Sequence, residues 1–314
     1  MNPLISILIP VFQAEKTICR CLKSVLEQTN DNFEVVIIDD GSTDATPSIC
    51  QSFACDKRFR IYSQCNMGVA ATRQKLMELA RGKYIQFVDA DDWVEPNMVE
   101  RYCEILHESA PDLVISDYIL HLSGGSGYQS QEPSSLTSAA LIKDISSQRM
   151  LGVLWNKLIR KELFLGLEFP NLRYCEDWCI CLSLFQRAKR IEYNKFAFYH
   201  YDNTIVENSL TRNITPQTFK YRIEYLEYLK SIKFNELYPK EYASRVVGIG
   251  YTAIVYKIYS DKEFKNIFRG VSYWNNYNLA YRRALLIMTY FFSQSLIRNI
   301  DSLVRRLTGK VNIS

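Results

Sequence analysis

The sequence lacks any run of about 18 uncharged apolar residues, the length at which a helix begins to span a bilayer. A membrane-spanning helix is therefore not predicted. The first residues, MNPLISILIPVF, also lack the basic flank and the cleavage site of a secretion signal. We expect them to contain a first strand, and we expect the protein in the cytoplasm.

The nine cysteines are not spaced as a paired CxxC framework. Disulfide scaffolds and structural zinc sites both show regular cysteine spacing. We therefore interpret these cysteines as reduced, partly buried thiols. A zinc site formed by Cys175, Cys179 and Cys181 is the less favoured alternative. No fixed-period repeat occurs, and a hydrophobic share of 47% is typical of a globular protein.

The positive charge gathers in the last third of the chain. Residues 215–314 contain 16 Lys and Arg against 7 Asp and Glu, whereas residues 1–214 contain 22 against 27. This asymmetry suggests an acidic partner, either nucleic acid or an anionic membrane surface. Residues 281–310 are basic and amphipathic, so they either contact a membrane interface or pack on the rest of the chain. Nucleic-acid binding is not predicted, because no recognised nucleic-acid-binding fold accompanies the charge.

The first 120 residues alternate short apolar runs with segments of helical period. This alternation predicts an α/β fold with a doubly wound, mostly parallel, Rossmann-like sheet, followed from about residue 216 by a helical region. Residues 121–136 are rich in Gly, Ser and Gln and are expected to form a mobile loop, either a lid or a surface excursion. We expect strands at 4–9, 34–38, 60–63, 84–88 and 113–116, and helices at 15–28, 45–54, 68–81 and 96–108.

Polar residues follow three of the expected strands, at 10–15, 39–44 and 89–93. Because ligands bind beyond the carboxyl ends of parallel strands, these segments are expected to meet at one edge of the sheet. The third segment contains Asp89, Asp91 and Asp92, whose mutual repulsion is unfavourable unless a cation lies among them. Carboxylate oxygens suit Mn²⁺ or Mg²⁺, which usually also bind substrate phosphates.

A series of short motifs carries a family resemblance. Residues 3–212 contain, in order, ISILIPVFQAEKTICRCLKSVLEQT, VVIIDDGSTDAT, NMGVAATRQ, GKYIQFVDADDWVEP, WNKLIRKELF, the acidic pair of RYCEDW, and NSLTR at 208–212. Together they resemble the family 2 glycosyltransferases of the GT-A fold, as found in bacterial polysaccharide synthesis. Family members commonly have Tyr-Asn where this chain has Phe12-Gln13, and Arg-Asn where it has Arg73-Gln74. The last hundred residues carry no such resemblance.

The resemblance implies an inverting, metal-dependent hexosyltransferase. Its expected donor is a nucleotide diphosphate sugar, with UDP as the expected nucleotide, and its expected acceptor is a hydroxyl of a saccharide or of a lipid-diphosphate-linked sugar in surface polysaccharide biosynthesis. Residues 1–214 would form the GT-A nucleotide-sugar-binding and catalytic domain. Residues 215–314 would form a helical region that either associates with the cytoplasmic face of the inner membrane, as a peripheral contact, or packs on the catalytic domain.

The resemblance also implies roles for individual residues. Asp177 is the expected catalytic base, and Glu176 is expected to orient the acceptor or a neighbouring group; the alternative is that both acids only favour a helix N-terminus. Asp91 is the expected metal ligand, with Asp89 facing the ribose or the metal and Asp92 as a supporting or alternative ligand. The expected donor-binding residues are Pro10, Val11 and Phe12 around the base, Asp40 on the uracil ring, and Glu15, Asn66, Gly68, Arg73, Asp89 and Ala90.

Two other classes of protein compete with this interpretation. A nucleotidyltransferase of similar architecture would show a Gly-rich loop directly after the first strand, and IPVFQAEKT lacks those glycines. A nucleotide-sugar-binding protein without transfer activity would be expected to have lost the acids that this chain retains.

Overall fold

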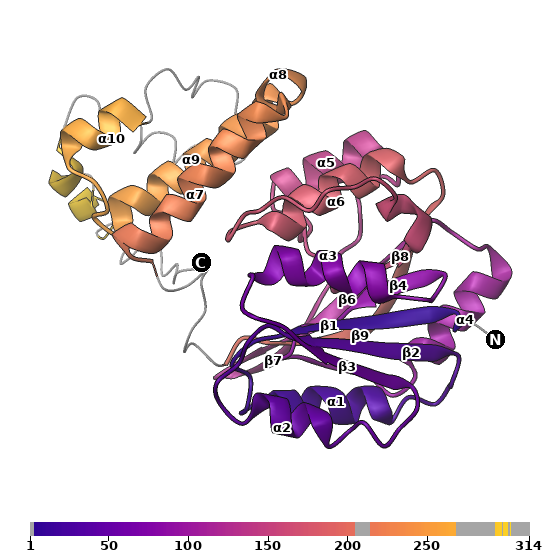
Figure 1. Ribbon diagram of the computed structural model, residues 1–314. Helices are drawn as coiled ribbons and strands as arrows, with labels where there is room; N and C mark the ends of the chain where they lie inside the picture. The colour runs from indigo at the N-terminus through magenta and orange to yellow at the C-terminus, as the bar shows by residue number, and fades with distance from the viewer. Residues whose placement is uncertain (1–2, 205–213, 268–292, 297, 301, 303–314) are drawn as a thin grey trace. The chain divides into compact units, whose positions relative to one another are not determined.

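The computed structural model describes residues 3–204, 214–267, 293–296, 298–300 and 302 (Figure 1). Packing divides the chain into two compact units. The first comprises Met1–Ile145 and Arg149–Ile205, and the second comprises Ser146–Gln148 and Val206–Ser314. This division concerns packing only, so the roles expected for residues 1–214 and 215–314 stay predictions.

The first unit is built on a mixed sheet with the strand order β3-β2-β1-β4-β8-β6-β9-β5, and β7 pairs with β6. Strands β1 to β4 run parallel to one another where they pair, β8 runs antiparallel to β4 and β6, and β9 runs parallel to β6 but antiparallel to β5. The strands are β1 (Ile5–Val11), β2 (Phe33–Asp39), β3 (Phe59–Ser63), β4 (Tyr84–Phe87), β5 (Trp93–Val94), β6 (Leu113–Leu122), β7 (Gly125–Gln129), β8 (Lys157–Arg160) and β9 (Ile191–Asp202).

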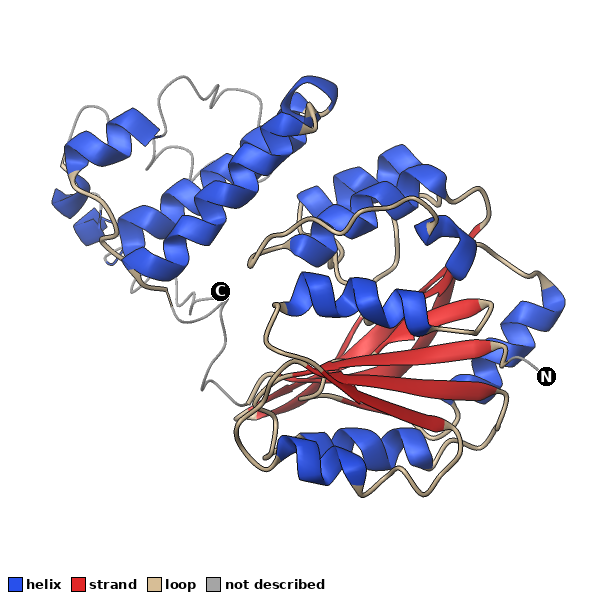
Figure 2. Ribbon diagram, in the orientation of Figure 1, coloured by secondary structure: helices blue, strands red, loops and turns tan. Residues whose placement is uncertain are grey.

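Helices cover both faces of this sheet (Figure 2). Helices α1 and α2 lie on one face, and α3 lies on the other (Figure 1). Because both faces are covered, β1 and β2 can be almost continuously apolar, and nearly all their residues are buried. The helices of this unit are α1 (Ile18–Leu26), α2 (Thr46–Gln51), α3 (Val69–Leu79), α4 (Met98–Glu108), α5 (Ser138–Ser146), the 3₁₀ helix η1 (Lys161–Phe164) and α6 (Glu176–Arg187).

The expected α/β order of the first 120 residues is confirmed. In α1 the face of Ile18, Leu22 and Val25 is buried as its helical spacing predicts. Pro96 lies just before α4, which begins at Met98 rather than at the proline. The strands that were not predicted, β5, β7, β8 and β9, each have an antiparallel partner.

The expected mobile loop at 121–136 is wrong for its first half, because β6 continues and β7 pairs back onto it. A buried carboxylate explains this order. Asp117 is fully buried in β6 and accepts hydrogen bonds from the hydroxyls of Tyr128 and Tyr193 and from the backbone amide of Gln131. Since a buried carboxylate needs such donors, the segment that supplies them is held against the sheet.

The second unit is helical over its described residues. Thr215 caps the first of its helices in a reciprocal pair with Thr218, and Phe219, Tyr225 and Leu229 form part of its core. Among the helices that the structure describes, none combines the length and apolarity needed to cross a membrane. Most of residues 281–310 lie outside the described residues, so the expected membrane contact stays a prediction. The helices are α7 (Pro216–Ser231), α8 (Phe234–Leu237), α9 (Pro239–Val255) and α10 (Asp261–Ile267).

Gly41, in the turn after β2, provides a test of this fold. Its φ is +80°, and a Cβ there would lie 2.9 Å from the backbone nitrogen of Asn66. We expect Gly41→Ala to lower the free energy of unfolding by about 2–3 kcal/mol, because a left-handed backbone alone costs about 1–2 kcal/mol and the neighbouring backbone must also shift. Gly166→Ala is the control, since Gly166 has φ +63° but no atom within 4 Å of the added Cβ. Equal losses in urea unfolding would contradict the close-contact argument.

Candidate active site

The segments after β1 and β2 are tied together at one edge of the sheet. The backbone amide of Gln13 donates to Ser42 Oγ at 2.8 Å, and the amide of Ala45 donates to Glu15 Oε2 at 3.0 Å. Glu15, which we expected to bind the nucleotide-sugar donor, therefore accepts a hydrogen bond that links the segment after β1 to the segment after β2. The two turns form one rigid rim.

Asp40 links a third segment, residues 64–68, to the same rim. Its buried carboxylate accepts from the side chain of Gln64 at 2.8 Å and from the backbone amides of Met67 and Gly68 at 2.9 Å each. These bonds hold the 64–68 segment against the end of β2 and leave Asn66 exposed at the rim. An ionised carboxylate has about four acceptor positions, so Asp40 can accept one more donor from a ligand.

The three residues expected around a nucleotide base differ in orientation. Val11 is 1% exposed and belongs to the core, whereas Phe12 is 51% exposed. Pro10 is partly buried. Phe12 is therefore the side chain of the three that offers an aromatic face to a ligand, and stacking of a nucleobase on such a face stabilises binding by about 1–3 kcal/mol.

The three acids after β4 occupy three different environments. Asp92 is fully buried, and its carboxylate accepts from the hydroxyl of Tyr199 at 2.6 Å and from the backbone amide of Asp202 at 2.8 Å. The same Tyr199 oxygen accepts from the amide of Asp89 at 3.0 Å. Burial, followed by the charges of Asp91 and Asp89, raises the pKa of Asp92. Asp92 thus supports the turn from inside, while Asp91 is exposed.

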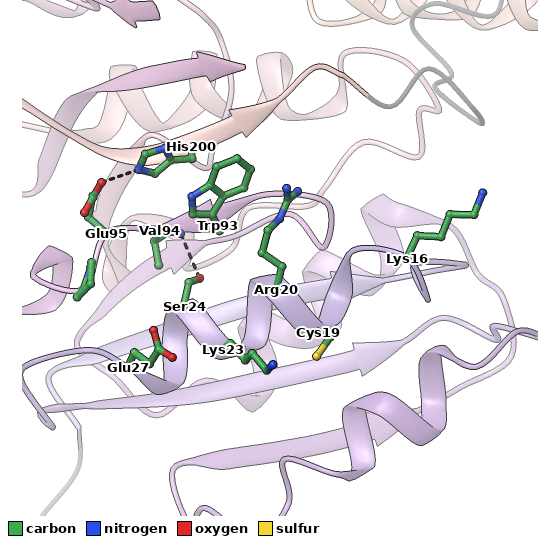
Figure 3. A pocket seen from close by; sticks show the side chains of 11 residues that line it. Lys16, Cys19, Arg20, Lys23, Ser24, Glu27, Trp93, Val94, Glu95 and His200 are labelled. Atoms are coloured by element: carbon green, nitrogen blue, oxygen red, sulfur yellow. Dashed lines mark hydrogen bonds and ion pairs between the residues drawn. The ribbon is translucent and has the colours of Figure 1, made fainter. Parts of the chain in front are cut away.

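An arginine braces the backbone of this turn from the α1 side. Arg20 donates to the backbone oxygen of Asp91 at 2.6 Å and pairs with Asp202 at 2.6 Å. Its guanidinium lies 3.9 Å from the ring centroid of Trp93, which stacks on His200 with centroids 5.0 Å apart. Figure 3 shows Trp93 between Arg20 and His200. All three side chains line a pocket of about 630 Å³. The sequence pattern did not point to Arg20, because its partners lie far along the chain.

The acids left at the rim suit a shared cation. Loss of hydration, followed by the charge of Asp89, raises the pKa of Asp91 to about 6, whereas the charge of Arg20 lowers it. Among the described residues, no group of three or more His, Cys, Asp or Glu is arranged to hold a metal. Divalent cations in proteins are often held by one or two carboxylates together with a ligand's phosphates, so Asp91 and Asp89 stay the expected metal ligands.

The acidic pair of α6 reaches the same edge through Arg73. The Nη1 of Arg73 donates to the carboxylate of Glu176, and the Nη2 of Arg73 donates to Asp89 Oδ1 at 3.1 Å. Arg73, which we expected to bind the nucleotide-sugar donor, is buried between these two acids. Burial and the charge of Glu176 raise the pKa of Asp177 to about 7, whereas the charge of Arg73 lowers it. A carboxylate with this pKa suits a general base near neutral pH.

Other residues singled out in the sequence lie elsewhere. Trp155 is buried and stacks on Tyr199 with centroids 4.4 Å apart, and Trp178 is buried in α6. Both therefore have a packing role. Ala90 packs against the core. The segment 208–212 lies outside the described residues.

Comparison with known proteins identifies relatives of this chain. The model of the family described as Glycosyl transferase family 2 matches residues 6–167. EpsH of Bacillus subtilis (strain 168) is 35% identical over 218 residues, which are 64% of this chain and 61% of EpsH. TuaG of the same organism, whose name links it to teichuronic acid biosynthesis, is 29% identical over 216 residues, which are 68% of this chain and 81% of TuaG. This chain thus spans less than two thirds of the length of EpsH.

Solved structures support the fold. S. aureus TarS 1-349 gives a TM-score of 0.67 at 19% sequence identity, with 99% of this chain and 92% of that chain covered. The same protein in complex with UDP-GlcNAc gives a TM-score of 0.63 at 17% identity, with 98% of this chain and 92% of that chain covered. The expected GT-A fold is confirmed.

The Tyr199 hydroxyl is predicted to hold the turn at residues 89–92, the acid turn, in place. We expect Tyr199→Phe to lower the free energy of unfolding by about 1–3 kcal/mol, because the buried Asp92 loses a hydrogen-bond donor. Tyr102→Phe is the control, since the buried Tyr102 hydroxyl is 3.4 Å from Ser116 Oγ and its hydrogen bond is long. If urea unfolding gives the same loss for both variants, the support of Asp92 by Tyr199 is wrong.

Proposed function

Because the chain belongs to glycosyl transferase family 2, we propose that it is an inverting, metal-dependent glycosyltransferase that moves a hexose from a UDP-sugar to an acceptor hydroxyl. One observation carries this proposal. Arg73 joins Asp89, at the end of β4, to Glu176, at the start of α6, and this bridge supports a single site for the donor-side acids and the acidic pair. A reaction between two bound substrates needs such a site.

The donor half of the site follows from the rim. Phe12 offers a face to the base, and Asp40 can accept the N–H of a uracil ring beside the ordered 64–68 segment. The complex of the structurally similar TarS with UDP-GlcNAc supports a nucleotide-sugar donor. Asp91, together with Asp89, would hold Mn²⁺ or Mg²⁺. Such an ion acts as a Lewis acid and stabilises the negative charge of a departing diphosphate.

The acceptor half depends on Asp177. As the acceptor oxygen forms its bond to the anomeric carbon, the bond from that carbon to the diphosphate oxygen breaks and its electron pair leaves with UDP. The proton of the acceptor hydroxyl passes to the Asp177 carboxylate. A single displacement of this kind inverts the anomeric configuration and needs no covalent sugar intermediate.

The acceptor class is proposed from chemistry and from relatives together. TuaG supports a role in polysaccharide biosynthesis, and a saccharide or lipid-diphosphate-linked acceptor would fit that role. A lipid-linked acceptor would bring the enzyme to the cytoplasmic face of the membrane. Residues 281–310 would then supply the peripheral contact, with their basic residues facing anionic lipid.

The metal assignment is tested by binding. We expect Asp91→Asn to weaken Mn²⁺-dependent binding of UDP at least tenfold, because the exposed carboxylate of the acid turn is lost. Isothermal titration calorimetry with UDP, with and without Mn²⁺, measures this change. Asp31→Asn is the control, since its side chain is 87% exposed and it precedes β2, on the opposite edge of the sheet. Unchanged affinity in Asp91→Asn would rule out this residue as the ligand.

The catalytic assignment is tested by turnover. We expect Asp177→Asn to lower kcat by about 10²–10⁴ while binding of UDP with Mn²⁺ is retained, because a general base acts on the chemical step. In the unmodified protein kcat should rise with pH through about 7, since Asp177 must be ionised to accept a proton. UDP release from a panel of UDP-sugars, with saccharide and lipid-linked acceptors, provides the assay.

Controls separate this role from its alternatives. Glu162→Gln removes another acid from the first turn of a helix and should leave kcat unchanged. Near-normal turnover in Asp177→Asn would contradict the assignment. Binding of UDP-sugars without UDP release in any combination would favour a protein without transfer activity, and release of inorganic diphosphate would favour a nucleotidyltransferase.

A further inference from the structure

We propose that Arg73 is a positioning residue that fixes the Glu176–Asp177 pair relative to the donor-side acid Asp89, and that it does not bind the donor's diphosphate. This inference rests on the proposed function, because it assigns Arg73 a part in the same reaction. It differs from the role that the family resemblance implied, in which Arg73 contacts the donor.

The geometry of the guanidinium carries the inference. One terminal nitrogen donates to Glu176 and the other donates to Asp89 at 3.1 Å. The two carboxylates come from the start of α6 and the end of β4, and Arg73 itself lies in α3. Because the two N–H groups belong to one planar group, bonding both carboxylates sets their separation and orientation. Asp177 is the next residue after Glu176, so its position follows from this bridge.

Burial argues against a role as a free phosphate ligand. Arg73 is 6% exposed, and its Nε–H is buried without a hydrogen-bond partner in the described residues. An unpaired buried donor costs about 1–3 kcal/mol. Buried ion pairs also contribute little net stability, since desolvation opposes their attraction. An arrangement that is unfavourable in these two ways is better explained by a function of the bridge than by stability.

The charges around Asp177 show why the bridge affects the reaction. Arg73 is a cation that lowers the pKa of Asp177, whereas burial, Glu176 and Asp89 raise it. Lys157 also faces Asp177, but its ammonium donates to the carbonyls of Leu151 and Val153 and to Asn156. Among the described residues, the titratable groups whose charge is coupled to that of Asp177 are Glu176 and Cys181 from α6, Arg73 from α3, Asp89 from the end of β4 and Lys157 from β8.

Two substitutions of Arg73 separate charge from geometry. We expect Arg73→Met to lower kcat at least 100-fold and to move the acidic limb of the kcat–pH profile upward by about one pH unit, because Asp177 loses its cation. We expect Arg73→Lys to leave that limb near its original pH but to lower kcat about tenfold, because one ammonium cannot hold both carboxylates as the planar fork does. In both variants calorimetry should show UDP–Mn²⁺ affinity unchanged or tighter, since Asp89 is released from its ion pair.

Arg60 is the matched control. It is another largely buried arginine in the first unit, and it pairs with Glu34 at 2.9 Å and donates to the backbone oxygen of Leu79. Arg60→Met should reduce stability in urea unfolding yet leave kcat, KM and the kcat–pH profile unchanged. A general loss of packing would instead affect both arginine variants alike.

Two outcomes would overturn the inference. One is a loss of UDP–Mn²⁺ affinity above tenfold in Arg73→Met with kcat retained at saturating donor, which would mean a diphosphate contact. The other is an unchanged kcat–pH profile in that variant. An inactive unmodified protein would count against the proposed function alone. The inference is then decided by carbon-13 NMR titration of labelled Asp carboxyls. The signal of Asp177 is assigned because it is missing from the spectrum of Asp177→Asn. Arg73→Met should raise the pKa of Asp177 in this titration.

Discussion

Like charge at the end of β4 is the constraint on which the site depends. Asp89, Asp91 and Asp92 repel one another, and each of the three carboxylates has different surroundings. Asp92 is buried against hydrogen-bond donors, Asp89 is paired with Arg73, and Asp91 is left exposed with a raised pKa. Asp92 is thus occupied inside the protein and Asp89 is shared with Arg73. In the proposed function the exposed Asp91 meets the cation together with Asp89.

Two arginines on opposite faces of the sheet stabilise this arrangement. Arg20 of α1 holds the backbone of the acid turn on one side, and Arg73 of α3 holds Asp89 on the other. The mixed sheet is what makes the first contact possible, since β9 runs parallel to β6 and ends at Asp202, the carboxylate partner of Arg20. Strand β9, which the sequence pattern did not predict, is therefore part of the support of the site.

Features that depend on neighbouring residues could be predicted from the sequence, whereas contacts between residues far apart in the sequence could not. Strands such as β1 and β2 were predicted because covered parallel strands form continuous apolar runs. Strand β7 was missed because its two glycines and its serine indicate a loop, while the buried Asp117 that holds it is a tertiary feature. The acids of the site could be found by motif, but the contrast between buried Asp92 and exposed Asp91 could not, since both follow the same strand. Arg20 was missed because its partner Asp202 lies 182 residues away in the sequence.

The balance of charges around Asp177 also explains why an arginine suits position 73. A general base works best when its pKa lies near the working pH, and an ordinary exposed aspartate is too weakly basic for that. Burial beside Glu176 raises the pKa of Asp177, but burial and a like charge alone would favour the protonated form. A cation bonded to Glu176 limits that rise and keeps the carboxylate available. Since arginine remains charged when it is buried, it can perform this task where a lysine, whose pKa falls on burial, could lose its charge.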